Sequence, residues 1–480
     1  MDRPTLRRGI GRAGFFALAF GSMIGVGWVT ALGPWLTSAG PGGTIVAFVA
    51  GGLLMAAIGL CYAELCAAIP VAGGEVAYAY AAYGSGKAFL VGWFLAFGYL
   101  AVSAFEAISV GRVASQLWPQ LDVVPLYQVG EATIFLPHLL LALICTGGIT
   151  WINYRGVQQA ARLQVVLTAA FILVALVFVV AGLVGGDLGS VEPWFAGDTA
   201  GTAALGVASV LVTAPFWFVG FDTIPQGAEE ASGQVPPRFL GVVLLGSIAG
   251  AAVFYCLLVT AVAATGPWQQ TAVAELPAAA AFEQALGSPL LGKCVLVAAL
   301  LGLFTSWNGF FLAGSRVLFA LGRGRIGPPL LGRTHARFGT PANAVLLSGA
   351  ITLGGALLGR GAMVAFIDVG SFCIAIAFFG VAFSATRLRT LRADLPRPYR
   401  MPGGRIVPAV SMLGAGGILL AMLVPGSPVA LVWPLEWLLL LAVIVLGWLF
   451  WHLGRPARAG CPEPERERLV LGDYARDSSG

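Results

Sequence analysis

Two stretches of this chain place helix-breaking residues and polar groups inside otherwise apolar segments. The first is ALAFGSMIGVGWVTALGP, residues 17–34, in which Gly21, Gly25 and Gly27 crowd the middle of a hydrophobic run. Each glycine weakens a helix by about 1 kcal/mol relative to alanine. Backbone that leaves the helix inside a membrane exposes its N–H and C=O groups, so it has to line a cavity or bind a ligand.

The second stretch is VTAPFWFVGFDTIPQGAEE, residues 212–230, and it is interrupted in the same way. Gly220, Asp222 and Pro225 lie within it, and Pro215 precedes them. Proline costs a helix interior about 3 kcal/mol because it has no amide hydrogen to donate. We therefore expect a second helix break at this place.

Backbone at such breaks suits a zwitterionic ligand. The N-terminus of a half-helix presents N–H groups and a partial positive charge, which bind a carboxylate, whereas exposed carbonyl oxygens bind an ammonium group or a cation. Glycine also lets a ligand approach the main chain closely. The alternative is that Gly21 and Gly25 only allow helices to pack tightly, but a paired break favours binding.

Four acidic residues lie within apolar segments, where a charge is costly and usually functional: Glu64, Glu106, Asp222 and Asp368. Glu106 is a candidate to bind a cationic substrate or to carry a coupling proton, and the alternative is a structural bond, for example with Arg112. Asp222 is a candidate for gating or coupling, or for capping the helix that follows the break. We expect Glu64 and Asp368 to be structural.

The composition places these segments in a lipid bilayer. Of the 480 residues, 58% are hydrophobic and 10% are charged, whereas soluble domains carry about 25% charged residues. The scattered cysteines and histidines predict neither a disulfide framework nor a metal site, and no cofactor is expected. The absence of a nucleophile–base pair disfavours an intramembrane enzyme, and the absence of a soluble sensing domain disfavours a receptor.

Apolar runs of about 20 residues are long enough to cross a bilayer, and the sequence predicts twelve of them. The predicted helices cover residues 13–38, 43–69, 87–117, 134–153, 163–185, 203–229, 239–265, 291–321, 341–359, 363–386, 406–424 and 430–451.

The basic residues indicate the orientation. With the N-terminus in the cytoplasm, all of the 27 lysines and arginines except Arg112, Lys293 and Arg360 fall on the cytoplasmic side. The positive-inside rule then predicts a multi-pass protein of the cytoplasmic (inner) membrane with both termini in the cytoplasm. The net charge of +5 is thus a topology signal rather than a sign of nucleic-acid binding, and the lipid bilayer is the expected partner.

The two interrupted helices are the first and the sixth of the series. Interrupted helices at matching positions of successive five-helix units indicate an inverted-repeat transporter. We predict an all-α integral membrane protein with a five-plus-five inverted-repeat core, broken helices 1 and 6, and two peripheral helices. The expected divisions are an N-terminal segment (1–12), the transport core (13–390), the peripheral helices with their preceding loop (391–452) and a mobile cytoplasmic tail (453–480).

The order of several motifs resembles that of the amino acid–polyamine–organocation superfamily of permeases. GSMIGVGW is similar to the family's glycine-rich break in helix 1, and GFDTIPQGAEE is similar to its helix 6 signature. Four further stretches resemble family segments in the same order: CYAELCAAIPVAGGEVAYAY (61–80), NYRGVQQAARLQ (153–164), AGSRVLFALGRGRIGPPLLGRTHARFGTPANA (313–344) and DLPRPYRMPGG (394–404). Together they span most of residues 13–405.

The resemblance implies secondary transport of amino acids or related amines by alternating access. It assigns the substrate carboxylate to the backbone N–H groups of Val26 and Gly27. It assigns the α-amino group to the carbonyls of Met23, Phe216 and Val219.

The resemblance also implies the surroundings of the substrate. Phe97 and Val102 of helix 3 would lie beside it, Phe216 would act as an aromatic lid, and Asp222 would lie just beyond the second break. Gly25 would keep bulk away from the substrate carboxylate.

One departure from the family concerns coupling. Some proton-coupled members carry a lysine in the middle of helix 5, and the matching position here is Phe171 or a near neighbour. We expect H⁺ at Glu106 or Asp222 as the coupling ion, rather than Na⁺ at a weaker candidate site formed by Thr305, Ser306 and helix 1 carbonyls. Exchange or facilitated transport without an ion is a further alternative.

Together these observations predict a permease that moves amino acids across the cytoplasmic membrane, by proton-coupled uptake or by exchange. The alternative is a permease for amines such as ethanolamine or polyamines, which an acidic group in the distal pocket, Glu106 or Asp222, would favour.

Overall fold

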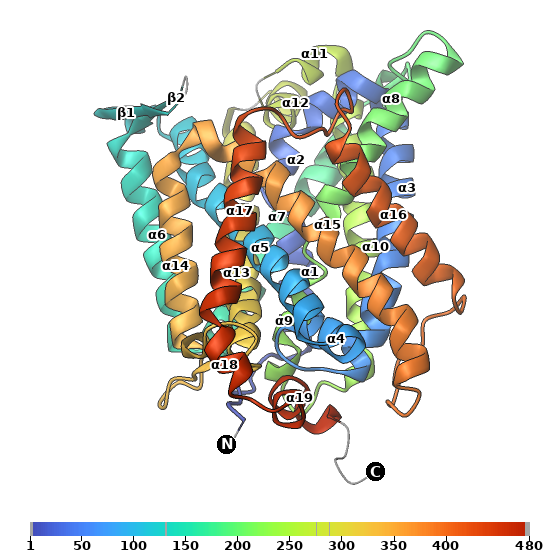
Figure 1. The fold of residues 1–480 in the computed structure, drawn as a ribbon. Coiled ribbons are helices and arrows are strands. Elements are labelled where there is room, and N and C mark those ends of the chain that lie inside the picture. Colours follow the sequence, from blue (N-terminus) through green and yellow to red (C-terminus); the bar gives the residue numbers. More distant parts are fainter. Residues whose placement is uncertain (1–2, 130–131, 275, 288, 476–480) are drawn as a thin grey trace.

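The structure is a computed structural model that describes residues 3–129, 132–274, 276–287 and 289–475, and it is almost entirely helical (Figure 1). Two short antiparallel strands, β1 (Pro125–Val129) and β2 (Ala132–Phe135), form a hairpin at the end opposite the chain termini.

The helices follow one another along the chain with short connections. The first half contains α1 (Arg12–Met23), α2 (Gly27–Thr30), α3 (Leu32–Ala68), α4 (Gly74–Tyr83), α5 (Ser85–Leu117), α6 (Leu136–Arg155), α7 (Val157–Gly185), α8 (Ala200–Thr213) and α9 (Thr223–Gly227). The second half contains α10 (Pro237–Ala264), α11 (Trp268–Ala272), α12 (Pro277–Leu286), α13 (Pro289–Arg323), α14 (Ala342–Leu358), α15 (Arg360–Leu391), α16 (Ile406–Leu423), α17 (Leu435–Leu453), α18 (Arg455–Ala459) and α19 (Glu463–Leu471). Short 3₁₀ turns are η1 (Pro119–Leu121), η2 (Leu188–Val191), η3 (Ala214–Phe218), η4 (Ala228–Glu230), η5 (Pro329–Gly332) and η6 (Gly472–Tyr474).

Eleven helices of the described residues are long and apolar enough to cross a membrane, which agrees with the predicted multi-pass architecture. The predicted helix 341–359 forms as α14 with 17 residues, whereas a typical span needs about 20. The count of twelve spans and the inverted repeat therefore stay predictions.

The first two predicted helices are joined without a loop. α3 contains the end of the first and all of the second, with a sharp kink at Gly40, whose φ is 71°. Glycine adopts this left-handed conformation without steric cost. Pro41 follows and begins the next helical segment, because proline is tolerated in the first turn of a helix.

The bundle has buried helices at its centre and lipid-exposed helices at its edges. α1, α5 and α13 are mostly buried, whereas most residues of α6, α16 and α17 are only partly buried or exposed. α5 packs against α13, α14 and α15, and α3 packs against α8 and α10. α6 and α14 form one flank of the bundle, and α16 lies at the other flank (Figure 1).

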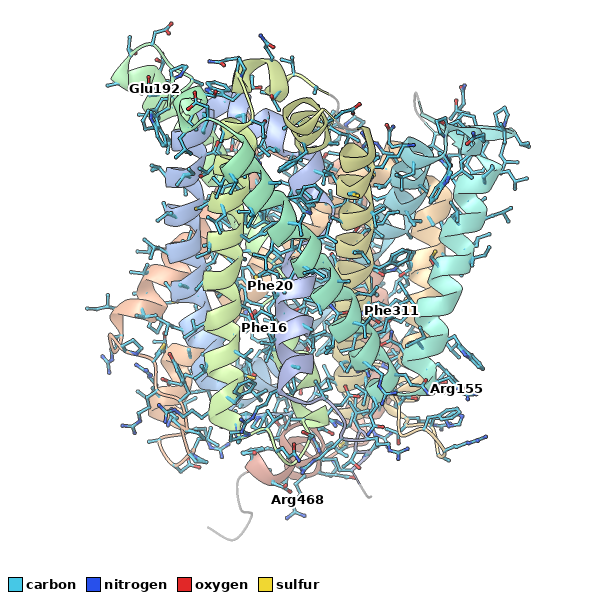
Figure 2. The ribbon with its side chains drawn as sticks, turned by 180° about the vertical axis from the view of Figure 1, so that it is seen from behind. Phe16, Phe20, Arg155, Glu192, Phe311 and Arg468 are labelled. Atoms are coloured by element: carbon cyan, nitrogen blue, oxygen red, sulfur yellow. The ribbon has the colours of Figure 1, made fainter. Side chains whose placement is uncertain are left out.

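The two ends of the bundle differ in charge. Figure 2 shows Arg155 and Arg468 at the end where both termini lie, and Glu192 at the opposite end. This distribution is the one from which the orientation was predicted.

The C-terminal segment is folded, so the predicted mobile tail is wrong for residues 455–475. Glu463 accepts a hydrogen bond from Tyr80 of α4 at 2.7 Å, Arg466 donates to the carbonyl of Cys461 at 2.7 Å, and Val470 and Leu471 are buried. The prediction followed the polar composition of the whole tail. It missed these few anchoring residues, which bury apolar surface against the bundle.

Candidate substrate-binding cavity

At the first break, two glycines have neighbouring atoms packed closely against their backbone. α1 ends at Met23 and α2 begins at Gly27, and the residues between them are not helical. A Cβ atom at Gly27 would lie 2.1 Å from the Trp217 ring, and one at Gly25 would lie 2.8 Å from Oε1 of Glu106. Only glycine allows these approaches.

The second break lies directly against the first. α8 ends at Thr213, and the 3₁₀ turn η3 follows with Pro215 near its start. Gly220 then adopts a φ of 133° before α9 begins. A Cβ atom at Gly220 would lie 2.6 Å from the backbone nitrogen of Met23, so the two breaks meet at the centre of the bundle.

Tyr255 of α10 ties the two breaks together. Its hydroxyl donates to the carbonyl of Trp217 at 3.1 Å and lies 3.4 Å from the carbonyl of Met23. Sequence reasoning missed this residue, because nothing in its local pattern distinguishes it from other aromatic residues of an apolar helix.

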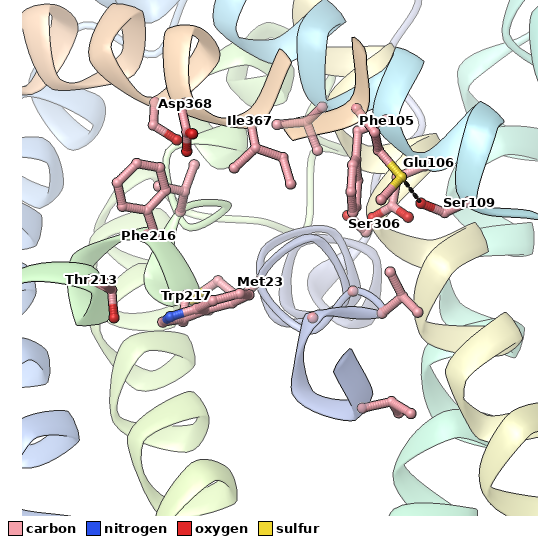
Figure 3. Close-up of a pocket in the computed structure, with 18 of the residues that line it drawn as sticks. Met23, Phe105, Glu106, Ser109, Thr213, Phe216, Trp217, Ser306, Ile367 and Asp368 are labelled. Carbon is pink, nitrogen blue, oxygen red and sulfur yellow. Dashed lines mark hydrogen bonds between the residues drawn. The ribbon is translucent and has the colours of Figure 1, made fainter. Parts of the chain in front are cut away.

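A cavity of about 430 Å³ opens beside the two breaks (Figure 3). Its lining includes the main-chain positions predicted for the substrate: Met23, Gly25, Val26, Gly27, Phe216 and Val219. Val102, Glu106 and Ser306 also line it. The lining continues to Gln116 and Val432, near the end of the bundle opposite the termini.

Glu106 is a buried acid at the wall of this cavity. It is 2% exposed, and its Oε1 atom lies, with the hydroxyl of Ser306 on α13, beside Gly25. Its Oε2 atom has no hydrogen-bond partner among the described residues. In Figure 3, Phe105 and Glu106 lie on one side of the cavity, with Phe216 and Asp368 on the other.

The remaining candidate residues differ in whether they line the cavity. Phe97 packs in a cluster with Ala101 and Phe366, and it is not among the residues that line the cavity. Asp368, expected to be structural, does line it. Glu64 forms an ion pair with Arg389 at 2.6 Å, as a structural role requires.

Asp222 is buried just beyond the second break. One carboxylate oxygen accepts the N–H of Gly220 at 2.8 Å, and the other accepts the Tyr99 hydroxyl at 2.7 Å. Asp222 directly precedes α9, but its side chain makes no capping hydrogen bond to that helix. It therefore stabilises the turn of the break rather than the N-terminus of α9.

Groups at and near the candidate sodium site form hydrogen bonds with one another within the chain. Thr305 donates its hydroxyl to the carbonyl of Gly302 at 2.8 Å. The amide of Gln164 on α7 donates to the carbonyls of Ala17 at 3.1 Å and Thr305 at 2.9 Å. These contacts join α1, α7 and α13 without a cation. Phe171, at or near the position expected to match the lysine of some family members, packs edge-on against Trp28.

Buried ion pairs close the end of the bundle that carries the termini. Arg316 pairs with Glu230 at 2.8 Å and Arg323 with Glu229 at 2.7 Å, which ties α13 to η4. Arg3 reaches Glu229 at 3.0 Å from the N-terminal segment. The cavity is therefore accessible from one end of the bundle and sealed at the other.

Apolar spans around an interior cavity at two helix breaks define a multi-pass membrane protein of the transporter class. Residues 10–451 match the family model described as amino acid permease, and the chain belongs to this family. The prediction from the sequence motifs is confirmed, and the members of the family are transporters rather than enzymes.

Individual relatives cover most of the chain. The branched-chain amino acid permease BcaP of Bacillus subtilis is 27% identical over 421 residues, 85% of this chain and 87% of that protein. The methylthioribose transporter of Bacillus subtilis is 27% identical over 410 residues, 83% of this chain and 84% of that protein. The amino-acid permease RocE of Bacillus subtilis is 26% identical over 339 residues, 70% of each chain.

Proposed function

We propose that the protein is a secondary active transporter that moves amino acids across the cytoplasmic membrane by alternating access. The observation that carries this proposal is the meeting of two helix breaks at a cavity that is open at one end and sealed at the other. The names of the relatives support amino acids as the substrate class. Residues 13–390 would form an inverted-repeat transport core, flanked by the segment 1–12, the peripheral helices in 391–452 and the tail 453–480.

The substrate main chain would bind to the breaks. The N–H groups of Val26 and Gly27 lie at the start of α2, where a helix N-terminus favours a carboxylate. The carbonyls of Met23, Phe216 and Val219 would accept hydrogen bonds from the α-amino group.

The substrate side chain would extend toward the far wall of the cavity. Val102, Phe105 and Ile374 line this space with apolar surface, so a hydrophobic side chain would be favoured by its transfer from water. The ring of Phe216 would cover the bound substrate, and the missing side chain of Gly25 would leave room for the carboxylate. Asp222, just beyond the second break, would take part in gating or coupling.

The conformation would be outward-facing. The positive-inside rule assigns the arginine-rich end, which carries both termini, to the cytoplasm. The cavity then opens to the outside, and the ion pairs of Glu229 and Glu230 form the cytoplasmic closure.

Protons would be the coupling ion, taken up at Glu106 or Asp222. Both are buried acids near the breaks, and neither forms an ion pair among the described residues. Sodium coupling through Thr305 and Ser306 is the alternative, and there the Thr305 hydroxyl donates to the carbonyl of Gly302.

Uptake by purified protein in lipid vesicles tests the proposal. The twenty amino acids, ethanolamine and putrescine would be supplied under a proton gradient, under a sodium gradient and without either. We expect accumulation of an amino acid that depends on the proton gradient. Failure to transport any amino acid would overturn the proposal.

An amine permease is the second candidate, because Glu106 lines the cavity and its carboxyl has an oxygen without a partner among the described residues. The same uptake experiment separates the two candidates, since accumulation of ethanolamine or putrescine alone would favour the amine permease.

A further inference from the structure

A second group of buried polar side chains lies between the cavity and the sealed end of the bundle. Glu75 at the start of α4 accepts a hydrogen bond from the amide nitrogen of Gln226 on α9. Asp222, which precedes α9, accepts the hydroxyl of Tyr99 at 2.7 Å. Tyr62 of α3 is buried beside Glu75, and each of these five side chains is fully buried.

Several atoms of this group carry unused hydrogen-bonding capacity. Glu75 Oε1, the Tyr62 and Tyr78 hydroxyls and Gln226 Oε1 have no partner among the described residues. Leaving a buried polar group unsatisfied is costly, and such groups call for an explanation beyond packing. An open carboxyl oxygen that faces hydroxyl groups is suited to receive and release a proton.

The two carboxyls of this group lack a countercharge. The arginines at this end pair with other acids: Arg316 with Glu230, and Arg323 with Glu229. Within the part of the chain that the structure describes, neither Glu75 nor Asp222 forms an ion pair. The titratable groups that face Glu75 are Tyr62 and Cys66 from α3, Tyr78 from its own helix, Tyr99 from α5 and Asp222 beside α9.

The electrostatics therefore favour one shared proton. Two nearby carboxyls in an environment of low polarity resist being charged together. Burial, followed by the negative charge of Asp222, raises the pKa of the Glu75 carboxyl to about 8. The protonated form of Glu75 is thus favoured at neutral pH.

We propose that Glu75 is the group on the cytoplasmic side that accepts and releases the proton in a path that begins at Asp222. When the sealed end opens, Glu75 loses its proton to water. The carboxylic acid of Asp222, loaded from the cavity side, then gives its proton to the Glu75 carboxylate. Asp222 becomes a carboxylate and Glu75 a carboxylic acid, so the charge of the pair is conserved in the transfer. This path supplies a route for the proton in a chain that has Phe171 where relatives carry a lysine, and it rests on the proposed proton coupling.

Proton counting in vesicles tests this path. Wild type and the variants Glu75→Gln, Glu75→Asp and Tyr80→Phe would be reconstituted with a pH-sensitive dye inside, using the amino acid that the wild type takes up fastest. The first readout is proton entry per molecule of substrate. The second is exchange of labelled for unlabelled substrate at equal pH, which needs no net proton movement.

We expect Glu75→Gln to remove most of the proton entry per substrate, because glutamine cannot take up or release a proton at neutral pH, while exchange continues. Glu75→Asp keeps a carboxyl and should restore proton entry in part. Tyr80→Phe is the matched control, because it removes a hydroxyl from the same helix that bonds Glu463 outside this group, so its proton entry should equal that of the wild type.

Each other outcome has one meaning. Wild-type proton entry in Glu75→Gln would overturn the path alone. Substrate transport by the wild type without proton entry would overturn the proposed coupling and the path together. Loss of exchange in both Glu75 variants, with the proteins folded by gel filtration, would make Glu75 structural and would also overturn the path.

Discussion

At the residue scale, Gly25 is a position of the first break that leaves little room for a side chain. A Cβ atom there would lie 2.8 Å from Oε1 of Glu106 and 3.2 Å from the hydroxyl oxygen of Ser306. We expect Gly25→Leu to lower uptake by about a hundredfold, because a displacement of 1 Å in a binding site can have an effect of that order. The measurement is uptake per unit of protein in the membrane.

A second glycine provides the control for this substitution. Gly246→Leu changes the same residue type in α10, where a Cβ atom would meet nothing within 4 Å. This variant should transport like the wild type. Normal transport by Gly25→Leu would contradict the assignment of the substrate site.

Glu106 is the second position at which a single residue can be tested. Its unpartnered oxygen at the cavity wall can hold a proton, whereas a glutamine cannot. We expect Glu106→Gln to flatten the dependence of uptake on external pH while exchange at constant pH persists. An unaltered pH profile would assign Glu106 a structural role.

At the scale of elements, the ion pairs between α13 and η4 hold the sealed end. Arg323 is 3% exposed and pairs with Glu229 at 2.7 Å. Removing one partner of a buried ion pair costs about 3–5 kcal/mol. We expect Glu229→Gln to destabilise the sealed conformation and to expose the path to the cytoplasm.

Thiol labelling from the cytoplasmic side measures this change. A single cysteine at Ala228, which is 3% exposed, would be introduced after replacement of the seven native cysteines. Labelling should be faster with Glu229→Gln than without it. Glu465→Gln, at the same end, is the control and should have no effect. Equal labelling in both variants would show that the Glu229 pairs do not hold this end closed.

At the scale of the whole molecule, the orientation of the bundle decides which way the cavity opens. Gln116 lines the cavity near its accessible end. With the arginine-rich end in the cytoplasm, we expect a cysteine at Gln116 to react with a membrane-impermeant thiol reagent added outside intact cells. Bound substrate should slow this reaction.

A reporter at the C-terminus checks the same orientation independently. A fluorescent protein that folds only in the cytoplasm should be bright when fused after residue 480. A dark fusion that is present in the membrane, together with no external labelling at Gln116, would reverse the orientation.

Local sequence was enough to locate the helices and their two interruptions. Apolar runs determine where a chain can cross a bilayer, and glycine and proline act on their own backbone. The breaks near Gly25 and Gly220 could therefore be read without knowledge of any contact. The kink at Gly40 has the same local origin, although its effect of joining two predicted helices into α3 appeared only in the structure.

Only the tertiary structure decided which side chains meet. Glu75 and Gln226 are in contact although 151 positions separate them, Asp368 lines the cavity while Phe97 does not, and the tail is folded. These results depend on the rotation, depth and tilt of each helix, which are set by packing against its neighbours. A sequence that is apolar on every face of its helices carries little periodic signal to determine that rotation.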